Sequence, residues 1–200
     1  MKKIRNLIMA LVIGMMLTSC SSQNTQGSKS IENTNIENVD SIKNNSEEIK
    51  EETMTISELE EALNNQPMKV INTEYLVQSD EYKSLYPDML SAVIQNNSGT
   101  DVKNAIIGFV AWDGNNFPVK IEGSMDFNGG EYFKLVDCGD VNMINGATFG
   151  EGMGMELSEN NKISKFKAIV VSYTDFDGES WNNPLLDDFK EIYVDKKLVE

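Results

Sequence analysis

The candidates for nucleophilic and acid–base chemistry in this 200-residue chain include two cysteines, Cys20 and Cys138, and 32 aspartates and glutamates. Histidine is absent, and Arg5 is the only arginine. Without histidine the chain lacks the base of a Ser-His or Cys-His pair and the commonest ligand of transition metals. We therefore predict no catalytic residue, no metal ligand and no cofactor, and we expect that the protein is not an enzyme.

Cys138 lies in a setting that disfavours nucleophilic chemistry. It follows Asp137 directly, and Asp140 comes two residues later. A reactive thiol needs a base or a cation beside it, whereas these two carboxylates would raise the pKa of the thiol. We expect Cys138 to be a buried strand thiol, with no partner for a disulfide within the chain.

The acidic segment Asp175–Glu179 is the best candidate for a calcium loop, and its spacing does not fit one. An EF-hand places a glutamate six residues after the loop glycine, but the residue six positions after Gly178 is Pro184. The segment therefore predicts a solvated Asp-Gly turn. Two alternatives stay open: a calcium site that also uses Asp187 or Asp188, and a carboxylate-dependent enzyme of unknown substrate.

Cys20 ends the tetrapeptide Leu17-Thr18-Ser19-Cys20, which closes the apolar run Leu7–Leu17. Three cations precede that run, as in a secretory signal peptide, and the run is too short to span a bilayer. The tetrapeptide resembles the lipobox of bacterial lipoproteins. The resemblance implies that residues 1–19 are removed as a signal peptide and that the sulfur of Cys20 carries a diacylglycerol.

A lipidated Cys20 would place the protein on the outer face of the cell membrane. Two acyl chains bury methylenes at about 0.8 kcal/mol each, which is enough for stable anchoring. Removing Lys2, Lys3 and Arg5 with the signal peptide changes the formal charge from −15 to −18. A chain this acidic repels polyanions, so we expect no nucleic-acid partner. The expected partner is an envelope protein or a wall component.

Residues 20–52 form a polar segment that is rich in Ser, Asn, Gln, Glu and Lys and has no aromatic residue. Such a composition buries too little apolar surface to offset the entropy of ordering the chain. We expect a disordered tether with a mean reach of about 30 Å that holds the folded part away from the membrane. A weak helix is the alternative, because four isoleucines recur at loose spacing: Ile31, Ile36, Ile42 and Ile49.

Residues 53–66 predict a short helix, from Ile56 to about Asn64. Apolar residues at positions i, i+3 and i+7 form one stripe, and Pro67 favours an end before it. A face this narrow is expected to dock on its own domain. A capping box fits in two registers: Ser57 with Glu60, or Thr55 with Glu58.

Residues 67–200 change to alternating apolar and polar residues, which is the pattern of β-strands. Val102–Trp112 is expected to be a central strand covered on both sides, because its part Ala105–Trp112 is apolar on both faces. Phe117–Met125 alternates most clearly and is expected to be a strand with one buried face. About seven short strands predict an all-β sandwich, while Leu185–Leu198 fits either a helix or a strand. The other expected strands are Val70–Val77, Leu90–Ile94, Tyr132–Cys138 and Phe166–Tyr173.

Glycines and methionines are concentrated in the region 143–155, which we expect to be rich in loops. The spacing of Gly150, Gly152 and Gly154 does not match a phosphate-binding loop, and no helix is expected after it. Three methionines fit an adaptable contact surface and ordinary core filling equally well: Met143, Met153 and Met155.

A set of turn and core residues is spread over Met68–Leu198: Asn96-Asn97-Ser98, Ala111-Trp112-Asp113, Pro118-Val119-Lys120, Val141-Asn142, Gly146, Trp181 and Asn183-Pro184. Together they resemble the family called domain of unknown function 5780, which occurs in secreted proteins and lipoproteins of low-GC Gram-positive bacteria. The resemblance implies an immunoglobulin-like sandwich at the cell surface, and it implies no reaction.

These observations favour a binding module over an enzyme. We expect a membrane-anchored, non-enzymatic surface domain that binds its partner through loops or a sheet edge. Trp112 and Trp181 are expected to be framework residues, because large rings at a strand end and beside a turn can close a sandwich. For Trp181 the alternative is an exposed anchor for a partner, because it lies beside a loop.

Overall fold

The computed structural model describes residues 54–79, 81 and 85–199, all of which belong to one unit, Ile49–Glu200. The predicted signal peptide, the lipidation site at Cys20 and the predicted tether lie outside the described residues. Within the described part, no helix is long and apolar enough to cross a membrane.

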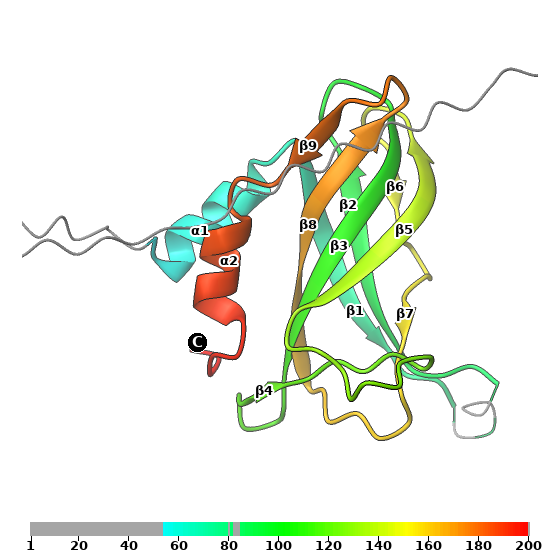
Figure 1. Ribbon diagram of the computed structural model, residues 1–200, viewed down its shortest axis with the longest axis vertical. Helices are drawn as coiled ribbons and strands as arrows, with labels where there is room; N and C mark the ends of the chain where they lie inside the picture. Colours follow the sequence, from blue (N-terminus) through cyan, green and yellow to red (C-terminus); the bar gives the residue numbers. More distant parts are fainter. Residues whose placement is uncertain (1–53, 80, 82–84, 200) are drawn as a thin grey trace, which may run out of the picture. The chain divides into compact units, whose positions relative to one another are not determined.

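The described residues form two antiparallel sheets and two helices (Figure 1). In the first sheet the strand order is β1-β2-β6, and β7 also pairs with β2. In the second sheet the order is β4-β3-β8-β9, and β5 also pairs with β3. The elements are α1 Ile56–Asn64, β1 Met68–Leu76, β2 Met89–Asn96, β3 Val102–Trp112, β4 Pro118–Val119, β5 Lys134–Met143, β6 Thr148–Phe149, β7 Met155–Glu156, β8 Lys165–Asp175, β9 Ser180–Asn182 and α2 Leu186–Tyr193.

The main core lies between the two sheets. Leu90 and Ile94 of β2 point to one face of their strand, as the two-residue period requires, and both are fully buried. They belong to the same apolar cluster as Ile107 and Phe109 of β3, in the second sheet. The prediction of a mostly β, sandwich-like protein is therefore confirmed. The described residues contain nine strands, of which β4, β6 and β7 have two residues each.

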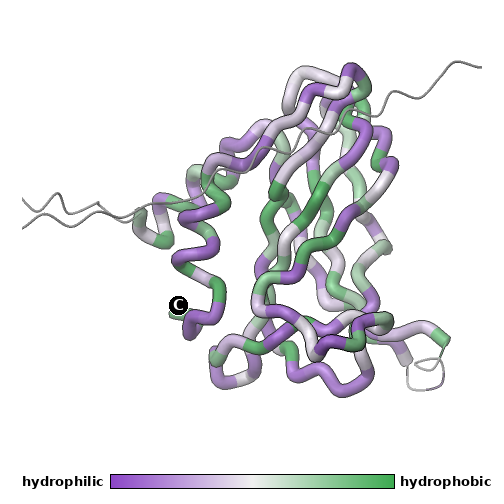
Figure 2. The backbone as a smooth tube through the Cα atoms, viewed as in Figure 1, coloured by the Kyte–Doolittle hydropathy of each residue, from purple (hydrophilic) through white to green (hydrophobic). Residues whose placement is uncertain are grey.

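Strand β3 also supplies a second core on its opposite face. Val110 and Trp112 pack there against Leu59 of α1 and against Phe189 and Tyr193 of α2. Both helices lie on one side of the β3–β8 sheet (Figure 1), and the hydrophobic stretches of the chain lie mainly along the strands (Figure 2). The predicted coverage of β3 on both faces is confirmed.

Helix α1 has the predicted bounds, and its first turn carries one of the two predicted capping boxes. The Glu58 amide donates to the Thr55 hydroxyl (3.3 Å), and the Thr55 amide donates to the Glu58 carboxylate (2.9 Å). These bonds satisfy amide groups that have no partner within the helix. The alternative box of Ser57 with Glu60 is wrong, because Glu60 has other partners.

Glu60 connects both helices to the sheet. Its carboxylate accepts hydrogen bonds from Lys167 of β8 (2.7 Å) and from the hydroxyl of Tyr193 in α2 (2.5 Å). Partial burial raises the pKa of Glu60, but the bonds from Lys167 and Tyr193 outweigh burial, so its pKa lies below the usual value. The same contact and burial raise the pKa of Tyr193. The helix layer is thus held by a polar link as well as by its apolar core.

The segment Leu185–Leu198, for which a helix and a strand both fitted the sequence, contains helix α2. Phe189 and Tyr193 lie four residues apart on one helical face and are buried. Asp187 and Asp188 occupy the first turn, where carboxylates interact favourably with the helix dipole.

The predicted strand Phe117–Met125 is wrong over most of its length. Only Pro118 and Val119 form a strand, β4, and the chain then makes two isolated bridges, Ile121 with Glu131 and Gly123 with Leu157. The chain turns after Gly123, because the Asp126 carboxylate accepts the Gly123 amide hydrogen (2.8 Å). Met125 is consequently 78% exposed.

Candidate functional site

An apolar pocket of about 140 Å³ opens between β5 and the interrupted edge formed by β6 and β7. Both short strands pair with β2, and residues 150–154 connect them without pairing. The pocket is a place where the core between the sheets reaches the surface. Its lining includes Leu90, Ile107, Phe109, Val136, Phe149 and Met155.

Glycines hold the connecting loop close to β2. A Cβ atom at Gly154 would lie 2.7 Å from the Leu90 carbonyl oxygen, so only glycine fits this approach. The Ser91 hydroxyl donates to the carbonyl of Gly150 (3.2 Å). The region is rich in loops, as predicted, and its glycines serve backbone packing.

The three methionines of this region divide between the two predicted roles. Met143 is 2% exposed and fills the main core. Met155 is half-buried in the wall of the pocket, and Met153 is 54% exposed at its mouth. Met143 is therefore a core residue, Met155 packs against the same core from the pocket wall, and Met153 is the exposed one that suits an adaptable contact.

Cys138 is a half-buried strand thiol that lines the same pocket. Burial is the main cause that raises the pKa of Cys138, to about 11, and the charge of Asp137 adds to it. The sequence predicted this direction from two flanking aspartates, but burial is the larger cause and Asp140 does not contribute. Among the described residues Cys138 is a free thiol.

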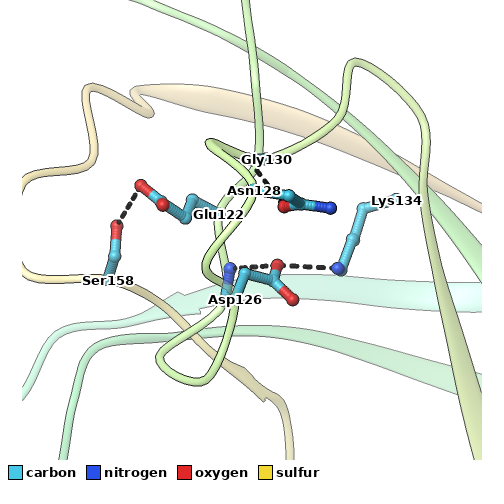
Figure 3. A network of polar contacts seen from close by, with 7 residues as sticks. Glu122, Asp126, Asn128, Gly130, Lys134 and Ser158 are labelled. Atoms are coloured by element: carbon cyan, nitrogen blue, oxygen red, sulfur yellow. Dashed lines mark hydrogen bonds and ion pairs between the residues drawn. The ribbon is translucent and has the colours of Figure 1, made fainter.

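A loop of residues 123–130 lies beside the pocket and is braced by Asp126. The Asp126 carboxylate accepts hydrogen bonds from the Gly123 amide (2.8 Å) and from Lys134 Nζ (2.7 Å), as Figure 3 shows. The bond from Lys134 is the main cause that lowers the pKa of Asp126. Because Lys134 is the first residue of β5, this ion pair fixes the loop to one wall of the pocket.

The 123–130 loop is also fixed to the opposite wall. The amide and the hydroxyl of Ser124 donate to the carbonyl and the carboxylate of Glu156 in β7, both at 3.0 Å. Just outside the loop, the Ser158 hydroxyl donates to Glu122 (3.4 Å) (Figure 3). Inside it, the Gly130 amide donates to the Asn128 side chain (3.2 Å). The backbone of the loop is therefore held on both sides.

This bracing presents two large apolar side chains to solvent. Met125 is 78% exposed and Phe127 is 94% exposed. Three glutamates lie next to the loop in sequence or bind it, Glu122, Glu131 and Glu156. Exposed apolar side chains beside these three carboxylates, which we call the acidic rim, are suited to contact with a partner.

The predicted acidic turn is confirmed, and its first carboxylate is used within the turn. Asp175 accepts hydrogen bonds from the amides of Asp177 and Glu179, both at 2.9 Å. In residues 54–79, 81 and 85–199, no three His, Cys, Asp or Glu side chains are grouped so that they could hold a metal ion.

The two tryptophans differ in burial. Trp112 is 1% exposed, and its indole nitrogen donates to the Lys196 carbonyl (2.8 Å). Trp181 of β9 is half-buried and stacks on Tyr173, with the ring centroids 5.3 Å apart. Trp112 is a framework residue, whereas Trp181 covers one edge of the main core.

Sequence reasoning missed the pocket and the first part of the loop, residues 123–127. The alternation of residues 117–125 was interpreted as a strand, which placed Met125 on a buried face. A signal was present in Met125-Asp126-Phe127-Asn128, where large apolar residues alternate with two residues typical of turns, just before Gly129-Gly130.

Comparison with known proteins supports the fold. An X-ray structure at 1.85 Å of a hypothetical protein from Peptoclostridium difficile 630 is similar, with a TM-score of 0.53 and 11% sequence identity, over 67% of this chain and 94% of that chain. At this identity the likeness concerns the fold alone. Among curated proteins no relative matches the chain.

The model of a family of unknown function, DUF5780, matches residues 89–196, from the start of β2 to just beyond α2. Because this match spans more than half of the sequence, the chain belongs to the family of unknown function DUF5780.

Proposed function

We propose that the protein is a lipid-anchored, non-enzymatic module on the outer face of the cell membrane, and that it binds an envelope or extracellular protein through the 123–130 loop. The observation that carries this proposal is the exposure of Met125 and Phe127 on a loop fixed at both sides. The two antiparallel sheets are consistent with an immunoglobulin-like sandwich, which we include in the proposal.

The bracing of the loop favours binding energetically. Exposed apolar side chains gain free energy when a partner removes them from water, at about 25 cal/mol per Å². Ordering a mobile loop would offset part of that gain. The hydrogen bonds of Asp126 and Ser124 fix the loop before the partner arrives, so less of the gain is lost. Phe127 is the larger of the two exposed side chains and the expected centre of the contact.

The acidic rim indicates the chemistry of the partner. Glu131 and Glu156 are exposed beside the loop, and the whole chain has a formal charge of −15. Like charges across an interface are destabilising. We therefore propose a protein whose contact surface has an apolar depression surrounded by Lys or Arg.

Replacing Phe127 by alanine should weaken the affinity for this partner by about 30-fold or more, the effect expected of a hot-spot residue. The full chain would be used to capture proteins from isolated cell envelopes by crosslinking, and the Kd of the captured protein would then be measured. Phe176→Ala is the matched control, because Phe176 is an exposed phenylalanine (58%) in the turn after β8. Equal affinity of the Phe127→Ala variant and the parent would contradict the proposed contact.

Replacing Cys20 by alanine should prevent lipid attachment, because the thiol that accepts the diacylglycerol is removed. The variant should stay unprocessed and should incorporate no labelled fatty acid, whereas Cys138→Ala should be processed and labelled like the parent. Metabolic labelling with a radioactive fatty acid, followed by detergent-phase partitioning, measures both. A Cys20→Ala protein that is still cleaved before residue 20 and still labelled would show that the anchor lies elsewhere.

A further inference from the structure

We propose that the apolar pocket between β5 and the β6–β7 edge binds a small uncharged hydrocarbon group about the size of a benzene ring. This site is separate from the protein contact proposed above, and it depends on other side chains. The proposal follows from the lining, the volume and the mouth of the pocket.

The side chains of the lining offer a polar ligand no strong hydrogen-bonding partner. Among the described residues that form it, all side chains are aliphatic, aromatic or sulfur-containing. The thiol of Cys138 is the most polar of them, and it already contacts the Val136 carbonyl (3.9 Å). A ligand hydroxyl, amide or charge would lose bonds to water and would find no side-chain partner in exchange. The lining therefore selects for hydrocarbon.

The volume sets the size of the group. The pocket holds about 140 Å³, close to the roughly 150 Å³ of a known apolar cavity lined by Leu, Ile and Phe that stays dry and binds benzene. Its floor is rigid, because Leu90, Ile107 and Phe109 are at most 3% exposed. A group much larger than one ring would have to displace these core residues.

The mouth provides access and excludes anions. Met153 is 54% exposed there, and its unbranched thioether side chain can move aside at little cost. Glu151 and Glu156, close to Met153 in the sequence, are also exposed, and the protein as a whole is strongly acidic. A carboxylate on the ligand would be repelled, so we infer an uncharged group.

Benzene is the probe for a direct test, with the full chain carrying Cys20→Ala so that Cys138 is the single thiol. The methyl resonances of Met153 and Met155, labelled with carbon-13 and assigned by Met→Leu replacement, should shift on titration and reach saturation. The resonance of Met125, on the exposed loop, should not change. Saturating benzene should also slow the reaction of Cys138 with a thiol reagent. Benzoate, which carries a charge, should bind at least about tenfold more weakly than benzene.

Ala92→Leu fills the pocket from β2 and should weaken benzene binding by about tenfold or more. If this variant does not fold, Val136→Phe fills the pocket from β5. Leu135→Ala is the control, because Leu135 is adjacent in sequence but points to the opposite face of β5 and does not line the pocket. The proposal is wrong if no resonance saturates, if benzoate binds as well as benzene, or if a filled variant binds like the parent. A second copy of the protein could also occupy the pocket through its 123–130 loop. In that case the methyl resonance of Met153 would shift with protein concentration in the absence of benzene, and Phe127→Ala would abolish this shift. That result would also show that the proposal is wrong.

Discussion

Replacing Trp112 by alanine should lower the free energy of unfolding by about 3–5 kcal/mol, the usual cost of deleting a buried tryptophan. A domain of this kind has about 5–15 kcal/mol of stability in all, so the variant should be close to unfolding at room temperature. The ring is 1% exposed, and it meets Tyr193 edge-on with the centroids 5.9 Å apart. Urea denaturation followed by circular dichroism measures the change.

Two further variants separate the contributions of Trp112. Trp112→Phe keeps most of the apolar volume, so it should lower the free energy of unfolding clearly less than Trp112→Ala does. What it removes is the indole N–H that donates to the Lys196 carbonyl. Trp181→Ala should also cost less, because that ring is only half-buried on Tyr173. If Trp112→Ala were no less stable than Trp181→Ala, the helix layer would not be held by Trp112.

The elements that could be predicted from the sequence are those specified by neighbouring residues. Strand β3 has its predicted bounds, because the apolar run Ala105–Trp112 is typical of a strand that lies between two layers. Helix α1 likewise has its predicted bounds, since the cap at Thr55 and the residues before Pro67 mark its ends. Both signals are local, so they could be interpreted without knowledge of the fold.

The failure at residues 117–125 has a different cause. Alternation predicts one buried face, but its end residues Phe117 and Met125 are exposed (54% and 78%), and within it Ile121 and Gly123 are buried. It does not predict whether a neighbouring strand is present to accept the backbone hydrogen bonds. Here Ile121 and Gly123 each make a single bridge, and Asp126 turns the chain instead.

The candidate site could not be predicted, because its parts meet only in the folded chain. The walls of the pocket come from β2, β3, β5 and the loop before β7. The loop beside it depends on an ion pair between Asp126 and Lys134, two residues that the turn between them brings together. The sequence did indicate that the thiol of Cys138 has low reactivity, but it did not indicate that this thiol lines a pocket.

Gly150 and Gly152 look alike in the sequence but have different surroundings in the folded chain. Both have positive φ, +107° and +69°, and in the sequence both are glycines of one Gly-rich segment. In the structure a Cβ at Gly150 would lie 2.3 Å from the backbone oxygen of Ala92, whereas a Cβ at Gly152 would meet nothing within 4 Å. The first residue touches β2, and the second faces open space.

Gly150→Ala should therefore destabilise the protein by about 3 kcal/mol or more, since backbone strain of about 1–3 kcal/mol adds to a contact that only a backbone shift can relieve. That shift would separate the loop from β2 and break the bond from the Ser91 hydroxyl to the Gly150 carbonyl. Gly152→Ala is the matched control, with the left-handed conformation alone costing about 1–2 kcal/mol. Thermal denaturation of both variants gives the comparison. Equal melting temperatures would mean that the loop does not lie against β2, and the wall that it gives to the apolar pocket would then be absent.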